Sequence, residues 1–167
     1  MNAGIKINKD VSLHNFINLL DKERKMVLEW RNNDSIRKWM LNKEKISYKN
    51  HNQFIKNLKN QKDSLYYLLK RNKEDIGVIY FKRSKQFTSL GIYSNPNTFG
   101  NGKILMESLC YHAFENLNVK TLIADVFDNN YPAINLYSKY NFKIKNNEKY
   151  YQKNLLRMEL KNEDWKI

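Results

Sequence analysis

Hydrophobic residues along this chain follow two spacings, one typical of strands and one typical of helices. Runs in which apolar residues alternate with polar ones, or continue without interruption between turn residues, predict strands. We expect these strands at residues 11–19, 64–71, 76–81, 89–93, 120–127, 142–145 and 150–160. The strand at 11–19 is expected at an edge of the sheet, and the nearly apolar strand at 120–127 is expected at its centre. A turn at 146–148 is expected to join the last two strands.

Apolar residues spaced three and four apart predict helices between these strands. Asp21, Ser47 and Asn130 are suited to cap three of the helix starts, and Pro132 suits the first turn of the last helix. The helices are expected at 21–32, 34–41, 48–58, 103–117 and 131–140. The resulting order is a strand, paired helices, three strands, a helix, a strand, a helix and two strands. The crossover around the fourth helix implies one parallel pair in an otherwise antiparallel sheet.

Two glycines, Gly100 and Gly102, lie between the strand that ends near Tyr93 and the next helix. Glycine permits a positive φ and a close approach of a ligand to the backbone, and we expect both residues to use this freedom. A helix start also presents unpaired N–H groups at its positive dipole end, which favours phosphate binding. An ordinary strand-to-helix turn would show the same Gly-x-Gly spacing, so the spacing alone leaves both interpretations open.

Length and composition make several classes of protein improbable for this chain, among them membrane, secreted and nucleic-acid-binding proteins. The chain has 167 residues, the length of one domain, and no stretch apolar enough for a membrane helix or a secretory signal, so we expect a single cytoplasmic domain over residues 1–167. The net charge of +13 could attract nucleic acid, but Lys and Asn are spread through every segment and no zinc-ligand or RNP-like motif is present. A basic surface is also compatible with an anionic substrate. Cys110 lies in an apolar helical row and is expected to be a buried thiol.

The loop Asn97-Thr-Phe-Gly100-Asn-Gly102 resembles the Gln/Arg-x-x-Gly-x-Gly/Ala loop of the GCN5-related N-acetyltransferases (GNAT), with Asn97 where Gln or Arg is usual. The order of elements is similar to that family over nearly the whole chain. The resemblance implies an α/β GNAT fold, with a mixed, mostly antiparallel sheet of six to seven strands flanked by helices. It also implies that loop amides bind the pyrophosphate of acetyl-CoA, and that no metal takes part. The acetyl-CoA contacts are then expected from Ile92, Tyr93, Asn97, Phe99, Gly100, Asn101, Gly102, Lys103, Ile104, Asn130, Ala133 and Tyr137.

A second segment, running from Asn130 through Ala133 and Tyr137, is similar to the same family's Asn-x-x-Ala-x-x-Leu/Phe-Tyr-x-x-x-Gly-Phe, with Asn141 in place of the glycine. Asn tolerates the left-handed conformation that a helix end requires. The spacing of the first three residues places them on one helix face, where they could contact the thioester or could serve only as helix cap and core.

Acetyl transfer to an amine requires a proton for the departing thiolate and a group that takes the amine's proton. A phenol with a pKa near 10 can supply a proton at neutral pH, so Tyr137 is the candidate general acid. In the family the backbone N–H groups that face the acetyl carbonyl would lie here around Ile92 and Tyr93. Asp125, in the middle of an apolar strand, is the candidate base, acting directly or through water. A paired structural carboxylate at this position is the open alternative.

Residues 28–32, 36–40, 51–55 and 90–96 resemble one subgroup of the family, the N-acetyltransferases of pseudaminic acid synthesis. The acceptor in that subgroup is the 4-amino group of UDP-4-amino-4,6-dideoxy-N-acetyl-β-L-altrosamine, which attacks acetyl-CoA directly in a ternary complex. A small hydroxyl residue is expected from this resemblance where the chain has Tyr80. By the same resemblance the residues of the nucleotide-sugar site are Arg31 at the diphosphate, and His51, Lys82, Arg83 and Tyr93 around it.

Each of those residues also has an ordinary surface role open to it, and two other functions stay open. One is acetylation of a protein N-terminus or a polyamine, although a polyamine site should be acidic and the acceptor-side segments here are basic and aromatic. The other is a basic interaction module that has the fold but no catalysis and does not bind acetyl-CoA. We expect a UDP-amino-sugar as partner, neither nucleic acid nor membrane, and leave a homodimer open.

Overall fold

A computed structural model describes residues 3–146, 149–150 and 153–166. In these residues nine strands form the sheet order β1-β2-β3-β4-β5-β6-β9-β7, with β8 paired to β9. The strands are β1 (Ile5–Lys6), β2 (Val11–Asn15), β3 (Ser64–Arg71), β4 (Glu74–Arg83), β5 (Thr88–Ser94), β6 (Thr121–Phe127), β7 (Lys143–Asn146), β8 (Lys149–Tyr150) and β9 (Lys153–Lys161). The α-helices are α1 (Asp21–Asn32), α2 (Asp34–Arg37), α3 (Tyr48–Leu58), α4 (Gly102–Tyr111) and α5 (Tyr131–Lys139). A π-helical turn, His112–Asn116, continues α4, and Phe16–Asn18 and Asn162–Asp164 form short 3-10 helices. No helix in this part of the chain is both long and apolar enough to cross a membrane.

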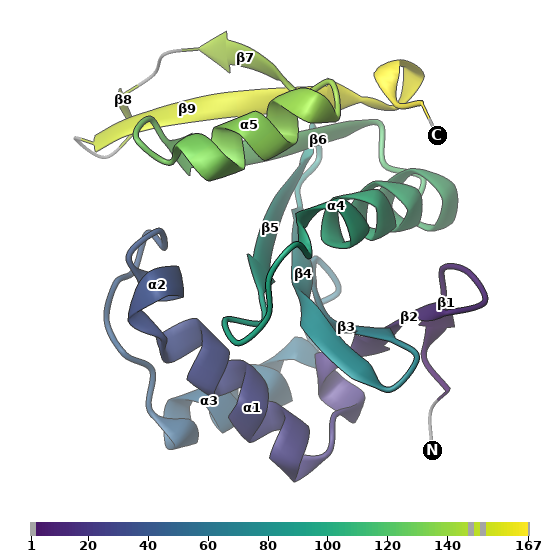
Figure 1. Ribbon diagram of the computed structural model, residues 1–167, viewed down its shortest axis with the longest axis vertical. Helices are drawn as coiled ribbons and strands as arrows, with labels where there is room; N and C mark the ends of the chain where they lie inside the picture. The colour runs from purple at the N-terminus through teal and green to yellow at the C-terminus, as the bar shows by residue number, and fades with distance from the viewer. Residues whose placement is uncertain (1–2, 147–148, 151–152, 167) are drawn as a thin grey trace.

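The helices cover opposite faces of the sheet (Figure 1). On one face α1 and α3 pack over β3 and β4, in a cluster that includes Trp30, Ile55 and Val78. On the other face α4 and α5 pack over β4, β6 and β9, in a larger cluster that includes Leu109 and Tyr137. Because side chains alternate along a strand, β4 contributes to both clusters. The α/β architecture expected from the sequence is confirmed.

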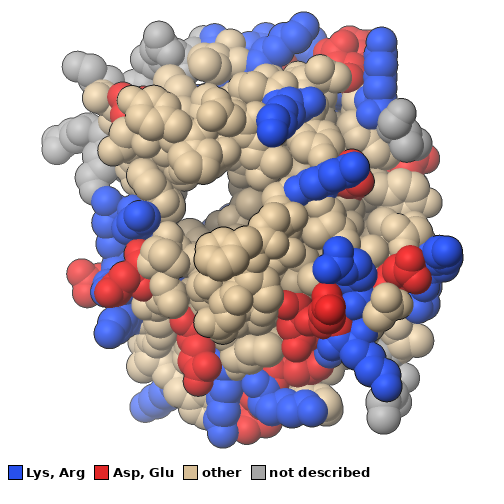
Figure 2. All heavy atoms as spheres, viewed as in Figure 1, with Lys and Arg blue, Asp and Glu red and all other residues tan. Residues whose placement is uncertain are grey.

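The one parallel pair, β5 with β6, is short. It consists of Thr88 opposite Leu122 and Ser89 opposite Ile123, whereas β5 continues to Ser94 and β6 to Phe127. Beyond these pairs the strands diverge, as Figure 1 shows. The space-filling view has an opening bordered mostly by uncharged side chains at the same place (Figure 2). The parallel pair expected from the crossover is therefore confirmed, and beyond Ser89 β5 no longer pairs with β6.

Most boundaries match the sequence pattern, and the exceptions lie in short or exposed segments. The strand expected at 11–19 ends at Asn15 and is not at the sheet edge, because the two-residue β1 pairs with its other side. The helix expected at 34–41 ends at Arg37, and none of its side chains is buried, so packing does not extend it. The single strand expected at 150–160 is divided between β8 and β9, and together with the unexpected β1 this gives nine strands in the described residues where seven were expected. The expected turn at 146–148 falls partly outside the described residues.

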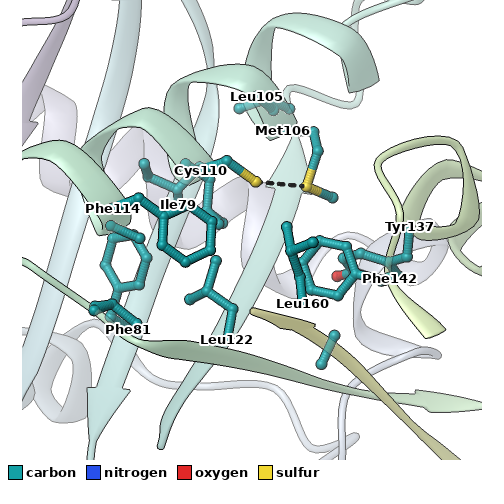
Figure 3. Close-up of a cluster of buried hydrophobic side chains, with 14 of the residues drawn as sticks. Ile79, Phe81, Leu105, Met106, Cys110, Phe114, Leu122, Tyr137, Phe142 and Leu160 are labelled. Carbon is teal, nitrogen blue, oxygen red and sulfur yellow. Dashed lines mark hydrogen bonds between the residues drawn. The ribbon is translucent and has the colours of Figure 1, made fainter. Parts of the chain in front are cut away.

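The larger core cluster contains the chain's single cysteine (Figure 3). Cys110 is fully buried in α4, and its Sγ lies 3.8 Å from the Sδ of Met106. Burial raises the pKa of the Cys110 thiol to about 12, so it stays protonated at neutral pH. This confirms the buried thiol expected from the sequence.

Candidate active site

The two glycines before α4 have different structural roles. Gly100 has a φ of 75°, and a Cβ there would meet no atom within 4 Å, so the backbone of the loop is open to a ligand. Gly102 does not adopt a positive φ, and that expectation was wrong, because Gly102 is the first residue of α4. A Cβ on Gly102 would lie 3.3 Å from the side chain of Leu136. The second glycine therefore lets α4 approach α5 closely.

The backbone amides at the start of α4 are suited to bind a diphosphate. The first hydrogen bond of this helix runs from the Leu105 amide to the Asn101 carbonyl, 3.1 Å away. The amides of Gly102, Lys103 and Ile104 precede it and have no acceptor within the helix. Together with the open backbone at Gly100, they form the kind of anion site that a helix N-terminus provides. The residues present thus fit the pyrophosphate of acetyl-CoA.

The remaining loop side chains differ in what they can offer a ligand. Asn101 is buried, and its Nδ2 donates to Thr98 Oγ1 at 2.6 Å and to Ser94 Oγ at 3.1 Å. Its side chain therefore braces the loop, and only its backbone is available to a ligand. Asn97 is exposed, and the Phe99 side chain is 97% exposed at the loop tip.

Tyr137 lies in α5 with its ring against Phe142, the ring centroids being 5.2 Å apart (Figure 3). The side chain is 5% exposed, and its hydroxyl makes no hydrogen bond with any described residue. Burial raises the pKa of this phenol, and the nearby Tyr80 and Cys110 raise it further. The Tyr137 hydroxyl therefore stays protonated across the physiological pH range, as the predicted general acid would have to be.

The other two residues of the helix face have local structural roles. Asn130 is the N-cap of α5, and its Oδ1 accepts a hydrogen bond from the Ala133 amide at 3.4 Å. Ala133 packs against the larger core cluster. Asn141, just after α5, has a φ of 68°, which confirms the left-handed helix end expected there.

Asp125, the candidate base, is engaged in an ion pair. Arg157, its cross-strand partner on β9, donates from Nε to Oδ1 at 2.9 Å and from Nη2 to Oδ2 at 3.1 Å. The Arg157 guanidinium also lies 5.3 Å from the centroid of the Phe87 ring. The ion pair with Arg157 is the structural role that the sequence left open as an alternative for Asp125. The assignment of Asp125 as the base stays a prediction.

A pocket of about 450 Å³ lies on the α1–α3 face of the sheet, beside β5. Aromatic and aliphatic side chains form most of its wall, with a few basic groups among them. Its lining residues are Phe16, Arg31, Met40, Leu41, Asn42, Ile46, His51, Phe54, Tyr66, Tyr80, Lys82 and Tyr93.

Two polar atoms in this wall are buried and have no hydrogen-bond partner among the described residues. One is Nη1 of Arg31, whose Nη2 donates to the Asn42 carbonyl at 2.7 Å. The other is Nε2 of His51. Burial lowers the pKa of His51, although the neighbouring Arg24 carbonyl opposes the shift, so the imidazole is neutral at pH 7. Buried polar groups without partners are rare in folded proteins, and in the wall of a pocket a ligand can supply the missing hydrogen bonds.

The segment between α2 and α3 forms one side of the pocket and is held in place. Asn32 donates from Nδ2 to the Ile46 carbonyl and accepts from the Ile46 amide, both at 2.8 Å. Arg37 Nη1 donates to the Lys43 carbonyl at 2.8 Å. The Lys43 ammonium lies 5.1 Å from the centroid of the Phe127 ring, so this segment also reaches the end of β6.

The structure brings together four of the five residues expected at the nucleotide-sugar site: Arg31, His51, Lys82 and Tyr93. It does not bring Arg83 there. Arg83 follows Lys82 directly on β4, so its side chain lies on the other face of the sheet, where Nη2 donates to the Leu117 carbonyl at 3.2 Å.

Two tyrosines of the pocket, Tyr66 and Tyr80, were not among the residues expected there, although a small hydroxyl residue was expected at position 80. Tyr80 lies two residues before Lys82 on the same strand, and Tyr66 is its cross-strand neighbour on β3. The period of two along a strand was the signal that could have found both.

Residues 16–143 of the chain match the acetyltransferase (GNAT) domain family. The chain belongs to this family. It is 36% identical over 140 residues to the acetyltransferase PseH of Campylobacter jejuni subsp. jejuni strain 81-176, an alignment that covers 83% of this chain and 88% of that protein. The crystal structure of Campylobacter jejuni N-acetyltransferase PseH in complex with acetyl coenzyme A superposes with a TM-score of 0.76 at 31% identity, covering 90% of this chain and 98% of that chain.

The GNAT family and the PseH relatives establish the reaction class. This chain is an acetyl-CoA-dependent N-acetyltransferase, and acetyl-CoA is its acetyl donor. A spermidine N-acetyltransferase from Vibrio cholerae, crystallised with CoA and spermine, has a TM-score of 0.81 at 15% identity and covers 94% of this chain and 98% of that chain. At 15% identity this similarity shows a shared fold and says nothing about the acceptor of this chain.

Proposed function

We propose that this N-acetyltransferase acetylates the 4-amino group of UDP-4-amino-4,6-dideoxy-N-acetyl-β-L-altrosamine in pseudaminic acid biosynthesis. The relationship to PseH supports the proposal. One observation carries it: Nη1 of Arg31 and Nε2 of His51 are buried without partners in the wall of the same pocket. Both atoms gain hydrogen bonds if that pocket holds an oxygen-rich anionic ligand.

The chemistry of the pocket wall favours a nucleotide-sugar over a polyamine. A guanidinium suits a diphosphate because its planar N–H groups match two phosphate oxygens, and Lys82 adds a second positive charge. The aromatic part of the wall offers apolar surface to a base or a sugar ring. No residue that lines the pocket within the described part of the chain carries a carboxylate, so a polycation would find no counter-charge there.

The residues divide the reaction among them. Amides at the start of α4 hold the donor's diphosphate, and the pocket orients the acceptor so that its amine faces the opening between β5 and β6. When the amine nitrogen forms a bond to the acyl carbon and the carbon–sulfur bond breaks, Tyr137 donates its hydroxyl proton to the sulfur. The amine's own proton passes to Asp125 or to water. Acetyl-CoA supplies the activated thioester and the acceptor supplies the amine that attacks it, so the protein contributes binding, orientation and proton transfer.

The test is a panel of acceptors incubated with acetyl-CoA while thiol release is followed. We expect turnover with UDP-4-amino-sugars and little with spermidine or a peptide N-terminus. Thiol release with polyamines or peptides alone would overturn the proposal.

Two arginine variants locate the acceptor site. Arg31→Gln should raise KM for the UDP-sugar by at least ~10-fold and leave KM for acetyl-CoA unchanged, because the lost guanidinium faces only the acceptor pocket. Arg83→Gln is the matched control, since its side chain lies on the other face of the sheet and should leave both constants unchanged. Equal effects of the two variants would contradict the assignment of the pocket.

A further inference from the structure

Tyr80 occupies an unusual position on β4. It lies directly opposite Tyr66 on one neighbouring strand and opposite Gly91 on the other. A Cβ on Gly91 would overlap the Cζ and the hydroxyl oxygen of Tyr80, so the phenol end of the ring covers the backbone of β5. Only glycine leaves room for it.

The neighbouring rings fix this orientation. The Tyr66 and Tyr80 rings are stacked with centroids 4.7 Å apart and planes 5° from parallel. Tyr66 is in turn held edge-on by Phe54 at 4.9 Å and lies 5.5 Å from Phe16. The Tyr80 ring is packed between the Tyr66 ring and the backbone of Gly91 and has little freedom to rotate. Its hydroxyl is therefore held at one place over β5.

That place lies between the acceptor pocket and the opening in the sheet. Tyr80 lines the pocket, and Gly91 is two residues beyond Ser89, the last residue of β5 that pairs with β6. Tyr80 is also close enough to influence the pKa of both Tyr93 in the pocket and Tyr137 in α5. Its hydroxyl makes no hydrogen bond with any described residue.

We infer that the Tyr80 hydroxyl orients the acceptor amine by accepting a hydrogen bond from one of its N–H groups, which turns the nitrogen lone pair toward the acyl carbon. The inference rests on the proposed function, because it takes the pocket as the acceptor side. Burial raises the pKa of Tyr80, so the phenol is neutral at physiological pH and does not bind a protonated amine as an ion pair. A hydrogen bond from one N–H of the neutral amine to this oxygen leaves the nitrogen lone pair free to attack.

The test compares Tyr80→Phe with Tyr67→Phe. Tyr67 is the adjacent buried phenol on β3, but its ring packs against His112 on the α4 face and takes no part in the pocket. In Tyr80→Phe we expect kcat to fall about 10-fold, with KM for acetyl-CoA and acceptor-independent thiol release unchanged, since only orientation of the amine is lost. Tyr67→Phe should match the wild type in all three.

A second variant addresses the same position without removing the hydroxyl. Gly91→Ala should displace the Tyr80 ring and reproduce the loss in kcat, provided that its melting temperature shows a folded protein. Unchanged kcat in Tyr80→Phe would overturn the inference. An equal loss of acetyl-CoA affinity in that variant would also overturn it, since the role would then be structural.

The experiment distinguishes a wrong substrate assignment from a wrong role of Tyr80. All variants are measured with whichever amine of the acceptor panel the wild type uses best. If that amine is not a UDP-sugar, the proposed substrate is wrong, while Tyr80 is still judged by the kcat ratio with the amine that reacts.

Discussion

Tyr137 combines burial, a free hydroxyl and a position in the α5 motif, which together give a specific prediction for its substitution. Tyr137→Phe should lower kcat by about 10²-fold and leave the dissociation constant of acetyl-CoA unchanged, because a general acid acts on the departing sulfur and not on the bound donor. Steady-state kinetics and isothermal titration calorimetry measure the two quantities.

The matched control for this substitution is Tyr140→Phe. Tyr140 follows α5 closely, but its hydroxyl donates to Glu107 at 3.3 Å near the surface. This variant should retain full kcat. If both variants lost activity to the same extent, the effect would belong to the packing of α5, and Tyr137 would not be the acid.

His112 is a second buried titratable residue, and it should affect stability without taking part in the reaction. It is 2% exposed, its ring lies 4.9 Å from that of Tyr67, and its Nδ1 is 2.9 Å from Asn116 Nδ2. Its Nε2 is buried without a partner, and burial lowers the pKa to about 4. The folded protein therefore holds this imidazole neutral.

The sign of the pH effect follows from the protons bound in each state. Between pH 6.5 and about 4 the unfolded chain protonates His112 and the folded chain does not, so the free energy of unfolding falls as the pH falls. Above pH 6.5 His112 does not change the free energy of unfolding with pH. By about pH 4 it has lowered the free energy of unfolding by up to about 3 kcal/mol. Urea unfolding of wild type and His112→Phe at several pH values measures it. The difference between the two proteins should change across this range, and a constant difference would contradict the prediction.

At the scale of the elements, the loop before α4 depends on one backbone conformation. Gly100 has a φ of 75°, which costs a β-branched residue about 1–2 kcal/mol. Gly100→Val should therefore weaken acetyl-CoA binding by about 10-fold, because the amides would no longer converge on the diphosphate. Calorimetric titration with acetyl-CoA measures the change.

Gly100→Asn is the matched variant for the same position. Asn72, Asn118 and Asn141 of this chain already adopt positive φ values of 56°, 54° and 68°. Asn at this position should therefore bind acetyl-CoA within about 2-fold of wild type. Equal weakening by Val and Asn would mean that the side chain, and not the backbone conformation, blocks the donor.

The elements themselves were largely predictable because their hydrophobic pattern is local. The strand at 64–71 was found at both ends, and that at 121–127 to within one residue, since β-branched and aromatic residues between polar turns specify them. The N-caps Ser47 and Asn130 were also found, because capping is a property of one side chain and the next turn. The N-cap expected at Asp21 was wrong, since Asp21 is the first residue of α1 and Leu20 is its N-cap. The two-residue β1 was missed because two residues carry no period.

The site was predictable only in part, because much of it depends on contacts between distant segments. Arg31 and His51 were placed by resemblance, and the structure brings both to one pocket. Gly102 was given a role in the turn, whereas its contact is with Leu136 on another helix. The position of Tyr80 over Gly91 depends on strand register, which the sequence pattern of either strand does not specify alone.

At the scale of the whole molecule, the two halves of the sheet meet at only two residue pairs, between β5 and β6. One half, with α1 to α3, contains the pocket, and the loop before α4 leads to the opening from the other face. Donor and acceptor can thus approach from opposite faces of the sheet and meet where the strands diverge. This separation explains why substitutions in the pocket and in the loop should affect different kinetic constants.

The net charge of +13 gives the last prediction, because acetyl-CoA and the proposed UDP-amino-sugar are both anions. Lys and Arg are interleaved with Asp and Glu over the face in Figure 2, so the attraction is a long-range field and not a single patch. Raising the salt from roughly 20 to 300 mM should lower kcat/KM for the UDP-amino-sugar several-fold, mainly through KM, because the Debye length shrinks to a few ångströms. An amino-sugar without the diphosphate, at saturating acetyl-CoA, should show a much weaker dependence. Equal salt dependence for the two acceptors would mean that the diphosphate is not what this basic surface attracts.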